Sequence, residues 1–79
     1  MSVKVLFFGA TAAISGRHEI ELTDFHGMWA RELFAHLLTE YPGLSGQKLL
    51  FSLNQQYSTG EEIIRSGDEI AIFTAVSGG

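Results

Sequence analysis

The sequence predicts a small α+β domain in which one helix lies across one face of a mixed β-sheet. Short runs rich in β-branched and aromatic residues lie near both ends of the chain, and each has the length of a strand. One longer segment between them has apolar residues at helical spacing. The chain has 79 residues, of which 46% are hydrophobic and 18% charged. That length has room for one thin core and one domain.

The N-terminal part of the chain is expected to form two strands joined by a loop. Residues 3–8 are β-branched and aromatic and too few for a stable helix, and Gly9 ends them. Residues 9–16 are small and mostly uncharged, so we predict a loop there. Residues 17–22 alternate at their end between polar and apolar side chains, as a strand buried on one side does. The two strands should pair as a hairpin.

A helix is predicted from Met28 onward, where the apolar period changes after a turn at residues 24–27. Pro42 and Gly43 should end the helix. No residue is a clear N-cap, and Asp24 is the nearest acidic candidate. The apolar stripe of this helix consists of Ala30, Leu33, Phe34, Leu37, Leu38 and Tyr41.

The second half of the chain is expected to form a third strand, a turn with or without a short edge strand, one helical turn, a tight turn and a last strand. We assign these elements to residues 47–53, 54–57, 61–65, 66–68 and 69–73, respectively. In the third strand, Leu49, Phe51 and Leu53 share one face. The domain is placed at 1–74, and residues 75–79 form a C-terminal tail with no reason to pack.

This element order fits a β-grasp, or ubiquitin-like, arrangement with the first and last strands side by side at the centre. A single helix can cover only one face of the sheet. The residues assigned to that covered face are Val3, Val5, Phe7, Ile70 and Ile72. Leu6, Phe8 and Phe73 then face outward, with Leu50 as a further candidate. A contiguous apolar patch of this kind indicates an interaction surface. A loop folded over the patch, or a bulge that shifts the alternation, is the alternative interpretation.

Composition excludes several classes of function. The net charge is −4, with only five Lys and Arg residues, which argues against binding to nucleic acid or to an anionic membrane surface. There is no cysteine, so disulfides, zinc–thiolate sites and cysteine nucleophiles are excluded. No apolar run is long enough to span a membrane, and no signal peptide is recognisable, so we expect a cytoplasmic protein.

The remaining chemistry-bearing side chains form no site pattern. The three histidines lie eight and ten residues apart in different predicted elements, so no metal site is predicted. Thr11 and Ser15 have no neighbouring base. Residues 9–16 lack the Lys-Ser/Thr pair of a phosphate loop. The acidic pairs at 61–62 and 68–69 are interpreted as solvated turns that could also contact a basic partner. The histidines are His18, His26 and His36.

The C-terminal Gly78 and Gly79 are the best candidates for a reactive group. Glycine has no Cβ, so its backbone can enter a narrow channel and adopt φ values closed to other residues. A terminal glycine carboxylate is unhindered for attack on a nucleotide phosphate, and a sulfur donor could then displace AMP to leave a thiocarboxylate. A flexible tail or a cloning remnant is the alternative.

Several segments resemble the ubiquitin-like sulfur-carrier family, and in particular the small, sulfur-carrying subunits of molybdopterin synthase. These segments are residues 3–8, Leu53-Asn54 before a turn, residues 66–71, and Val76-Ser77-Gly78-Gly79 at the end. The resemblance covers nearly the whole chain, although the middle helix matches only in its pattern. Two features depart from the family: Thr74-Ala75 stands where two prolines are common, and the loop at 9–16 lacks the usual charged residues.

The resemblance implies a function and a set of partners. A partner enzyme would use ATP to adenylate Gly79, the adenylate would become a thiocarboxylate, and no cofactor or metal would be bound by this chain. The tail, including Val76, Ser77 and Gly78, would enter the large synthase subunit and deliver sulfur to cyclic pyranopterin monophosphate. The family assembly is a heterotetramer, and the positions that match Phe8 and Phe73 lie in its partner interface.

Three other functions stay open from the sequence. The chain could carry sulfur to the thiazole of thiamine or to a tRNA base. It could be a ubiquitin-like modifier in which the activated Gly79 is joined to lysines. It could be a plain binding module in which Gly79 has no chemical role. In every case, we expect no turnover of a substrate by the isolated chain.

Overall fold

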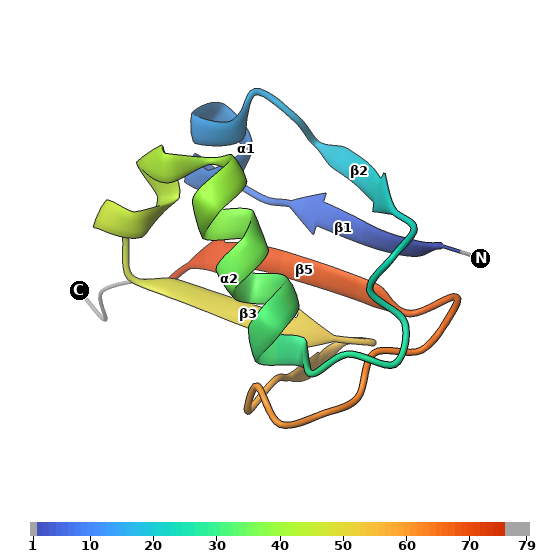
Figure 1. The fold of residues 1–79 in the computed structure, drawn as a ribbon. Coiled ribbons are helices and arrows are strands. Elements are labelled where there is room, and N and C mark those ends of the chain that lie inside the picture. The colour runs from blue at the N-terminus through green and yellow to red at the C-terminus, as the bar shows by residue number, and fades with distance from the viewer. Residues whose placement is uncertain (1, 76–79) are drawn as a thin grey trace.

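A computed structural model describes residues 2–75, and Met1 and residues 76–79 lie outside the described part. A mixed five-stranded sheet packs against one long helix that crosses one of its faces (Figure 1). The elements are β1 (Val3–Phe7), α1 (Ala10–Ser15), β2 (Glu19–Leu22), α2 (Ala30–Glu40), η1 (Pro42–Gly46), β3 (Leu49–Leu53), β4 (Gln56–Tyr57) and β5 (Glu69–Thr74).

The strand order is β2-β1-β5-β3-β4, which is the β-grasp arrangement predicted from the sequence. The first and last strands, β1 and β5, run parallel and adjacent, with Val5 opposite Ile70. The hairpin β1–β2 and the pair β3–β5 are antiparallel, as expected for strands joined by short connections or returning along the sheet. The short edge strand after β3 is present as β4, which pairs antiparallel with β3.

The core lies between the sheet and α2, and it contains the residues that alternation assigned to the covered face. Side chains of α2 interdigitate with those of the sheet, and the Phe34 and Phe51 rings stack with centroids 3.9 Å apart. Leu44 of η1 and Ile64 close the ends of the core and are fully buried. The buried apolar residues are Val3, Val5, Phe7, Ala30, Leu33, Phe34, Leu37, Leu44, Ile64, Ile70 and Ile72. The prediction of the covered face is therefore confirmed.

The start of α2 is stabilised by tertiary contacts. The N-cap position is Trp29, which makes no side-chain capping hydrogen bond, so Asp24 is not the cap. The backbone N–H groups of Ala30 and Arg31 instead donate to the carbonyls of Glu62 (2.8 Å) and Gly60 (2.9 Å). These are two of the N–H groups that a helix cannot satisfy internally. The missing sequence signal for a cap is explained, because the acceptors lie about thirty residues away along the chain.

The predicted helical turn at residues 61–65 is wrong, because this segment is extended. Trp29 and Ile63 form an isolated antiparallel bridge, and the N–H of Ile64 donates to the carbonyl of Met28 over 2.8 Å. The extended backbone buries the Ile64 side chain in the core. Pairing with the chain just before α2 therefore outweighs the local helical preference.

The loop before this segment is held by the Glu62 carboxylate. It accepts hydrogen bonds from the Ser58 hydroxyl (2.7 Å) and from the N–H groups of Thr59 (3.0 Å) and Gly60 (3.1 Å). Burial raises the pKa of the Glu62 carboxyl, but these hydrogen bonds favour the charged form more strongly and hold its pKa below the ordinary value. The interpretation of residues 61–62 as a simple solvated turn is wrong at Glu62, because its carboxylate is a structural acceptor.

The predicted loop at residues 9–16 is also wrong, because it contains the short helix α1. Gly9 and Gly16 bound the helix, and both have positive φ values, of 58° and 72°. Thr11 is fully buried, and its hydroxyl lies 2.7 Å from the carbonyl of Phe8 and 2.9 Å from that of Ile72. This hydroxyl therefore attaches the helix to the end of β5, and Thr11 has a structural role.

Candidate functional site

The face of the sheet opposite α2 carries an apolar surface built from four strands. β5 contributes Ala71 and Phe73 at its centre, and the registers place Leu6 of β1 opposite Ala71 and Leu50 of β3 opposite Phe73. Phe8 follows directly after β1, and Tyr57 of β4 lies opposite Ser52 of β3. We call this surface the open face and define it by Leu6, Phe8, Leu50, Tyr57, Ala71 and Phe73.

The open face is exposed to solvent in the described structure. Phe8 is 50% exposed and Tyr57 is 72% exposed, which is unusual for large apolar or aromatic side chains. Leu6, Leu50 and Phe73 are partly exposed. The expected outward orientation of Leu6, Phe8, Leu50 and Phe73 is therefore confirmed, and no described loop folds over them. Their role in binding a partner stays a prediction.

A shallow hollow of about 280 Å³ lies at one end of the open face. Its walls include Phe73 and Tyr57, whose ring centroids are 6.1 Å apart at an interplanar angle of 44°. Ser52 and Gln55 complete the lining. Sequence reasoning missed Tyr57 and Ser52. Alternation along β3 could have placed Ser52 on this face beside Leu50. The position of Tyr57 depends on the hairpin register, which is not readable from the sequence.

Two turns that lie side by side at one end of the open face, after β3 and before β5, are joined by polar side chains. Asn54 and Gln55 have positive φ values of 51° and 70°, as a two-residue hairpin turn requires. The Asn54 amide donates to the Asp68 carboxylate over 3.0 Å, and the N–H of Glu69 donates to the Asn54 side-chain oxygen over 3.0 Å. The N–H of Arg65 donates to Asp68 as well, over 2.8 Å. These contacts fix the start of β5, so Asp68 is more than a solvated turn residue.

The described residues hold no arrangement typical of a catalytic centre. No group of three or more His, Asp or Glu side chains in residues 2–75 could hold a metal ion. The Thr11 hydroxyl is engaged with backbone carbonyls, and Ser15 bonds locally to the carbonyl of Arg17 over 3.1 Å. Within residues 2–75, no helix is long and apolar enough to cross a membrane.

The path of β5 sets where the C-terminal residues leave the domain. Thr74 pairs with Leu49, and the N–H of Ala75 donates to the carbonyl of Lys48 over 2.8 Å. The chain therefore leaves the sheet at the end of β5 that carries Phe73, near η1 (Figure 1). Val76, Ser77, Gly78 and Gly79 lie outside the described residues, and their predicted roles stay predictions.

Comparison with known proteins identifies related chains over the full length. The model of the ThiS family matches residues 5–79. A molybdopterin synthase sulfur carrier subunit from Chlamydomonas reinhardtii is 34% identical, and the match covers 100% of both chains. Subunit 1 in a complex of subunits 1 and 2 of the molybdopterin-converting factor from Helicobacter pylori is similar in structure, with 26% identity, a TM-score of 0.70 and 100% coverage of both chains. Small archaeal modifier protein 1 from Haloferax volcanii has the same fold, with 21% identity, a TM-score of 0.84 and 100% coverage of both chains.

Proposed function

The chain belongs to the ThiS family, and from this premise we propose that it is the sulfur carrier subunit of a molybdopterin synthase. The observation that carries the proposal is the full-length similarity to a subunit of that name. The described structure adds an exposed apolar face on the same β5 that leads to the C-terminal Gly78-Gly79. A carrier needs both features, because a partner must hold the domain while the tail reaches a reaction centre.

In this proposal, the reactive group is the carboxylate of Gly79. An ATP-using partner adenylates it: a carboxylate oxygen attacks the α-phosphorus, and pyrophosphate leaves. A sulfur donor then displaces AMP and leaves a thiocarboxylate. The thiocarboxylate sulfur attacks cyclic pyranopterin monophosphate in the large subunit, and water then hydrolyses the bond between the Gly79 carbonyl and the sulfur, which leaves the sulfur on the pterin and regenerates the Gly79 carboxylate. The absence of cysteine in the chain is compatible with sulfur that is carried on the terminal carbon.

The open face is the proposed docking surface for the large subunit, with Leu6, Phe8 and Phe73 as central contacts. Burial of exposed aromatic side chains is a principal source of binding energy at such surfaces. Val76 and Ser77 would follow the chain into the partner. The assembly would be a heterotetramer in which this chain supplies sulfur and the partner supplies the acid–base residues. We place this activity in the cytoplasm, where ATP is available to the activating enzyme.

The same fold supports two other acceptors of the activated tail. Similarity to small archaeal modifier protein 1, at 21% identity, concerns the fold alone. A modifier would form isopeptide bonds between Gly79 and lysines of other proteins, whereas a different sulfur carrier would serve the thiazole of thiamine or a tRNA base. These functions differ in their partners, so a partner experiment separates them.

The test is a pull-down from the native host with an N-terminal tag, so that Gly79 stays free, followed by mass spectrometry. We expect recovery of a molybdopterin synthase large subunit, and loss of that recovery in Phe8→Asp or Phe73→Asp. Ile63→Asp is the matched control, because Ile63 is exposed to a similar degree as Phe8 (43% against 50%) but lies outside the open face. Deletion of Gly79 should preserve docking on the open face and abolish sulfur transfer.

Other outcomes would redirect the assignment. Recovery of a thiazole synthase or a tRNA-thiolating enzyme would replace molybdopterin by another acceptor. A ladder of covalent conjugates that disappears when Gly79 is deleted would establish a modifier. Equal recovery of the large subunit with Phe8→Asp, Phe73→Asp and Ile63→Asp would remove the open face from the proposal.

A further inference from the structure

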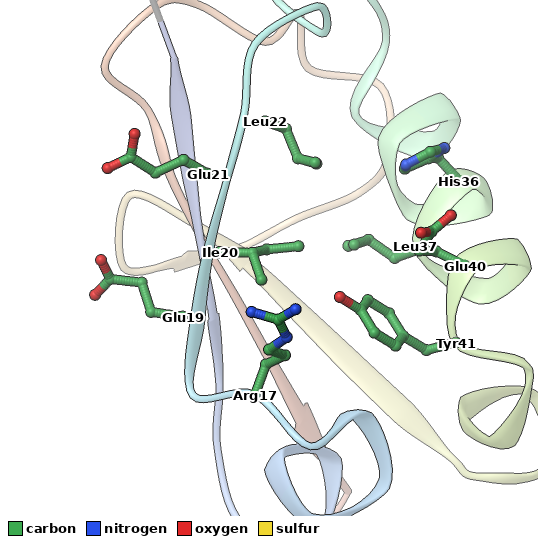
Figure 2. A pocket seen from close by; sticks show the side chains of 9 residues that line it. All are labelled: Arg17, Glu19, Ile20, Glu21, Leu22, His36, Leu37, Glu40 and Tyr41. Atoms are coloured by element: carbon green, nitrogen blue, oxygen red, sulfur yellow. The ribbon is translucent and has the colours of Figure 1, made fainter.

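A groove of about 450 Å³ lies between β2 and α2, on the side of the sheet opposite the open face. Figure 2 shows Ile20 and Leu22 of β2 pointing across the groove toward Leu37 of α2 and Tyr41, the residue that follows α2. Arg17 reaches into the groove beside Ile20. The other residues that line the groove are His36 and Glu40 from α2, and Glu19 and Glu21 from β2. The lining of the groove is therefore mixed: Ile20, Leu22 and Tyr41 are partly exposed in it, Leu37 is fully buried beneath, and polar groups form most of the exposed surface.

The groove runs beside an unpaired edge of the sheet. β2 is the terminal strand in the order β2-β1-β5-β3-β4, so it pairs with β1 alone. The N–H of Phe7 donates to the carbonyl of His18 over 2.9 Å. In an antiparallel pair, every second residue of β2, counted from His18, therefore bonds to β1, and the residues between them point away from β1. Ile20, which lies opposite Val5, thus bonds to β1. The backbone N–H and C=O groups of Glu19 and Glu21 point to the free edge of the sheet. Such groups can pair with another extended chain.

The two sides of this edge differ in chemistry. On one side, Ile20 and Leu22 point into the groove, and on the other the Glu19 and Glu21 side chains point away from it (Figure 2). Both glutamates are exposed. Glu19 has only a 4.0 Å contact with the Lys4 ammonium, and Glu21 has no ion pair with any described residue. The side chains of an extended chain that joined this edge would alternate between the side of Ile20 and Leu22 and the side of the two glutamates.

We propose that the β2 edge and its groove bind an extended segment of a partner protein in which apolar residues alternate with Lys or Arg. The segment would add a sixth strand beside β2, with main-chain hydrogen bonds to Glu19 and Glu21. Its apolar side chains would enter the groove against Ile20, Leu22 and Tyr41. Its basic side chains would face the two glutamates. This is recognition by strand addition, in which the backbone supplies affinity and alternate side chains supply specificity.

A second copy of this chain does not fit the same edge. Pairing of β2 with β2 would bring the Glu19 and Glu21 carboxylates of two molecules together, and like charges on neighbouring strands are destabilising. The net charge of −4 on each copy adds to this repulsion. Charge complementarity therefore selects a basic partner.

The proposed site does not depend on the proposed sulfur-carrier function. Its apolar contacts lie on the opposite side of the sheet from Leu6, Phe8 and Phe73, and they do not involve the C-terminal tail. The basic side chains of the segment would lie on the side of the open face, where Glu19 is opposite Leu6, so the two sites border each other at β2. Loss of binding at β2 would leave the sulfur-carrier proposal unaffected, and the reverse also holds.

The test is an NMR titration of the 15N-labelled full-length protein with an acetylated and amidated octapeptide of alternating lysine and valine. Up to about 1 mM peptide, we expect amide shifts at residues 19–22 and at Leu37 and Tyr41, with slower amide exchange at Glu19 and Glu21. The affinity should fall as salt is added, because surface charges are screened. The charge-reversed control is an octapeptide of alternating glutamate and valine, which should not bind.

Two variants locate the contacts. Glu21→Lys should weaken binding about three- to tenfold, since it turns an attraction into a repulsion at an exposed site. Glu61→Lys makes the same charge change at an exposed residue outside β2 and should change the affinity less than about twofold. Glu21→Pro removes an outward N–H, a change that an edge strand tolerates, and it should abolish the slowed exchange at Glu19.

Three results would overturn the proposal. One is equal binding of the glutamate–valine peptide, and another is a set of shifts confined to the open face. The third is no shift at residues 19–22 with the lysine–valine peptide, which would leave Glu19 and Glu21 as charges that protect an exposed edge from aggregation.

Discussion

The replacement Glu62→Gln tests whether a carboxylate in a loop stabilises the start of α2. The Ser58 hydroxyl and the Gly60 N–H donate to one carboxylate oxygen, and the Thr59 N–H donates to the other. A glutamine side chain keeps one oxygen but places an NH₂ group against the Thr59 N–H. The change therefore removes one charge-assisted hydrogen bond and weakens two others.

The expected magnitude follows from these contacts. Hydrogen bonds to charged groups contribute about 1.5–3 kcal/mol each, against about 0.5–1.5 kcal/mol for neutral pairs. Because Glu62 is only partly buried, we take the lower end of this range and expect a loss of about 1–2 kcal/mol in the free energy of unfolding. In a domain of this size, that corresponds to a fall of about 5–15 °C in Tm. Urea denaturation, with an unchanged m-value, measures the loss directly.

The pH dependence of the free energy of unfolding is a second and more specific test of the same variant. The folded-state pKa of Glu62 lies below the ordinary value of 4.5, so the native state favours the charged form. Its contribution to stability is complete above the unfolded-state pKa and is lost as pH falls through the folded-state value. The difference in stability between the natural protein and Glu62→Gln should therefore be constant near neutral pH and shrink below about pH 4.5.

The matched control is Glu61→Gln, because Glu61 is the exposed neighbour of Glu62 and its carboxylate is not part of this hydrogen-bond set. It should change stability by less than about 0.5 kcal/mol. The reasoning would be refuted by equal effects of the two substitutions, or by a Glu62→Gln difference that does not change between pH 7 and pH 3.

Three further predictions concern other parts of the fold. Thr11→Val removes a buried hydroxyl that is bonded to two backbone carbonyls, so it should lower the free energy of unfolding by about 1–2 kcal/mol in urea denaturation. An unchanged denaturation midpoint would contradict the structural role of Thr11. Leu37→Ala should lower the free energy of unfolding by about 2–5 kcal/mol, because Leu37 is fully buried. Leu38→Ala, at a half-buried site, should lower it clearly less in the same assay. The reverse order would contradict the assignment of the buried face of α2. Gln55→Gly should raise the stability by about 0.5–1 kcal/mol, because relief of the left-handed conformation at a φ of 70° (about 1–2 kcal/mol) exceeds the cost of the extra backbone entropy of glycine (about 0.5–1 kcal/mol). Calorimetry should show a higher Tm, and a lower Tm would mean that the Gln55 side chain contributes more than its backbone conformation costs.

Local patterns in the sequence were sufficient for the fold and for most of the open face. The stripe on α2 and the alternation in β1 and β5 depend on the geometric periods of helix and strand, which act within a few residues. They placed Val5 and Ile72 inside and Phe8 and Phe73 outside, and the structure agrees. The chemistry proposed for Gly79 came from residue type, position and the resemblance to sulfur carriers, and it stays a prediction.

Tertiary structure decided the features that depend on residues far apart in the chain. The start of α2 is completed by carbonyls of residues 60 and 62, and the extended conformation of residues 61–65 follows from that pairing and from burial of Ile64. Helix α1 exists where small residues predicted a loop, because Thr11 is attached to β5. The meeting of Tyr57 with Phe73, and the groove between β2 and α2, depend on strand register and helix placement. Each of these features is set by long-range contacts, and no local period in the sequence encodes which distant backbone group will be the partner.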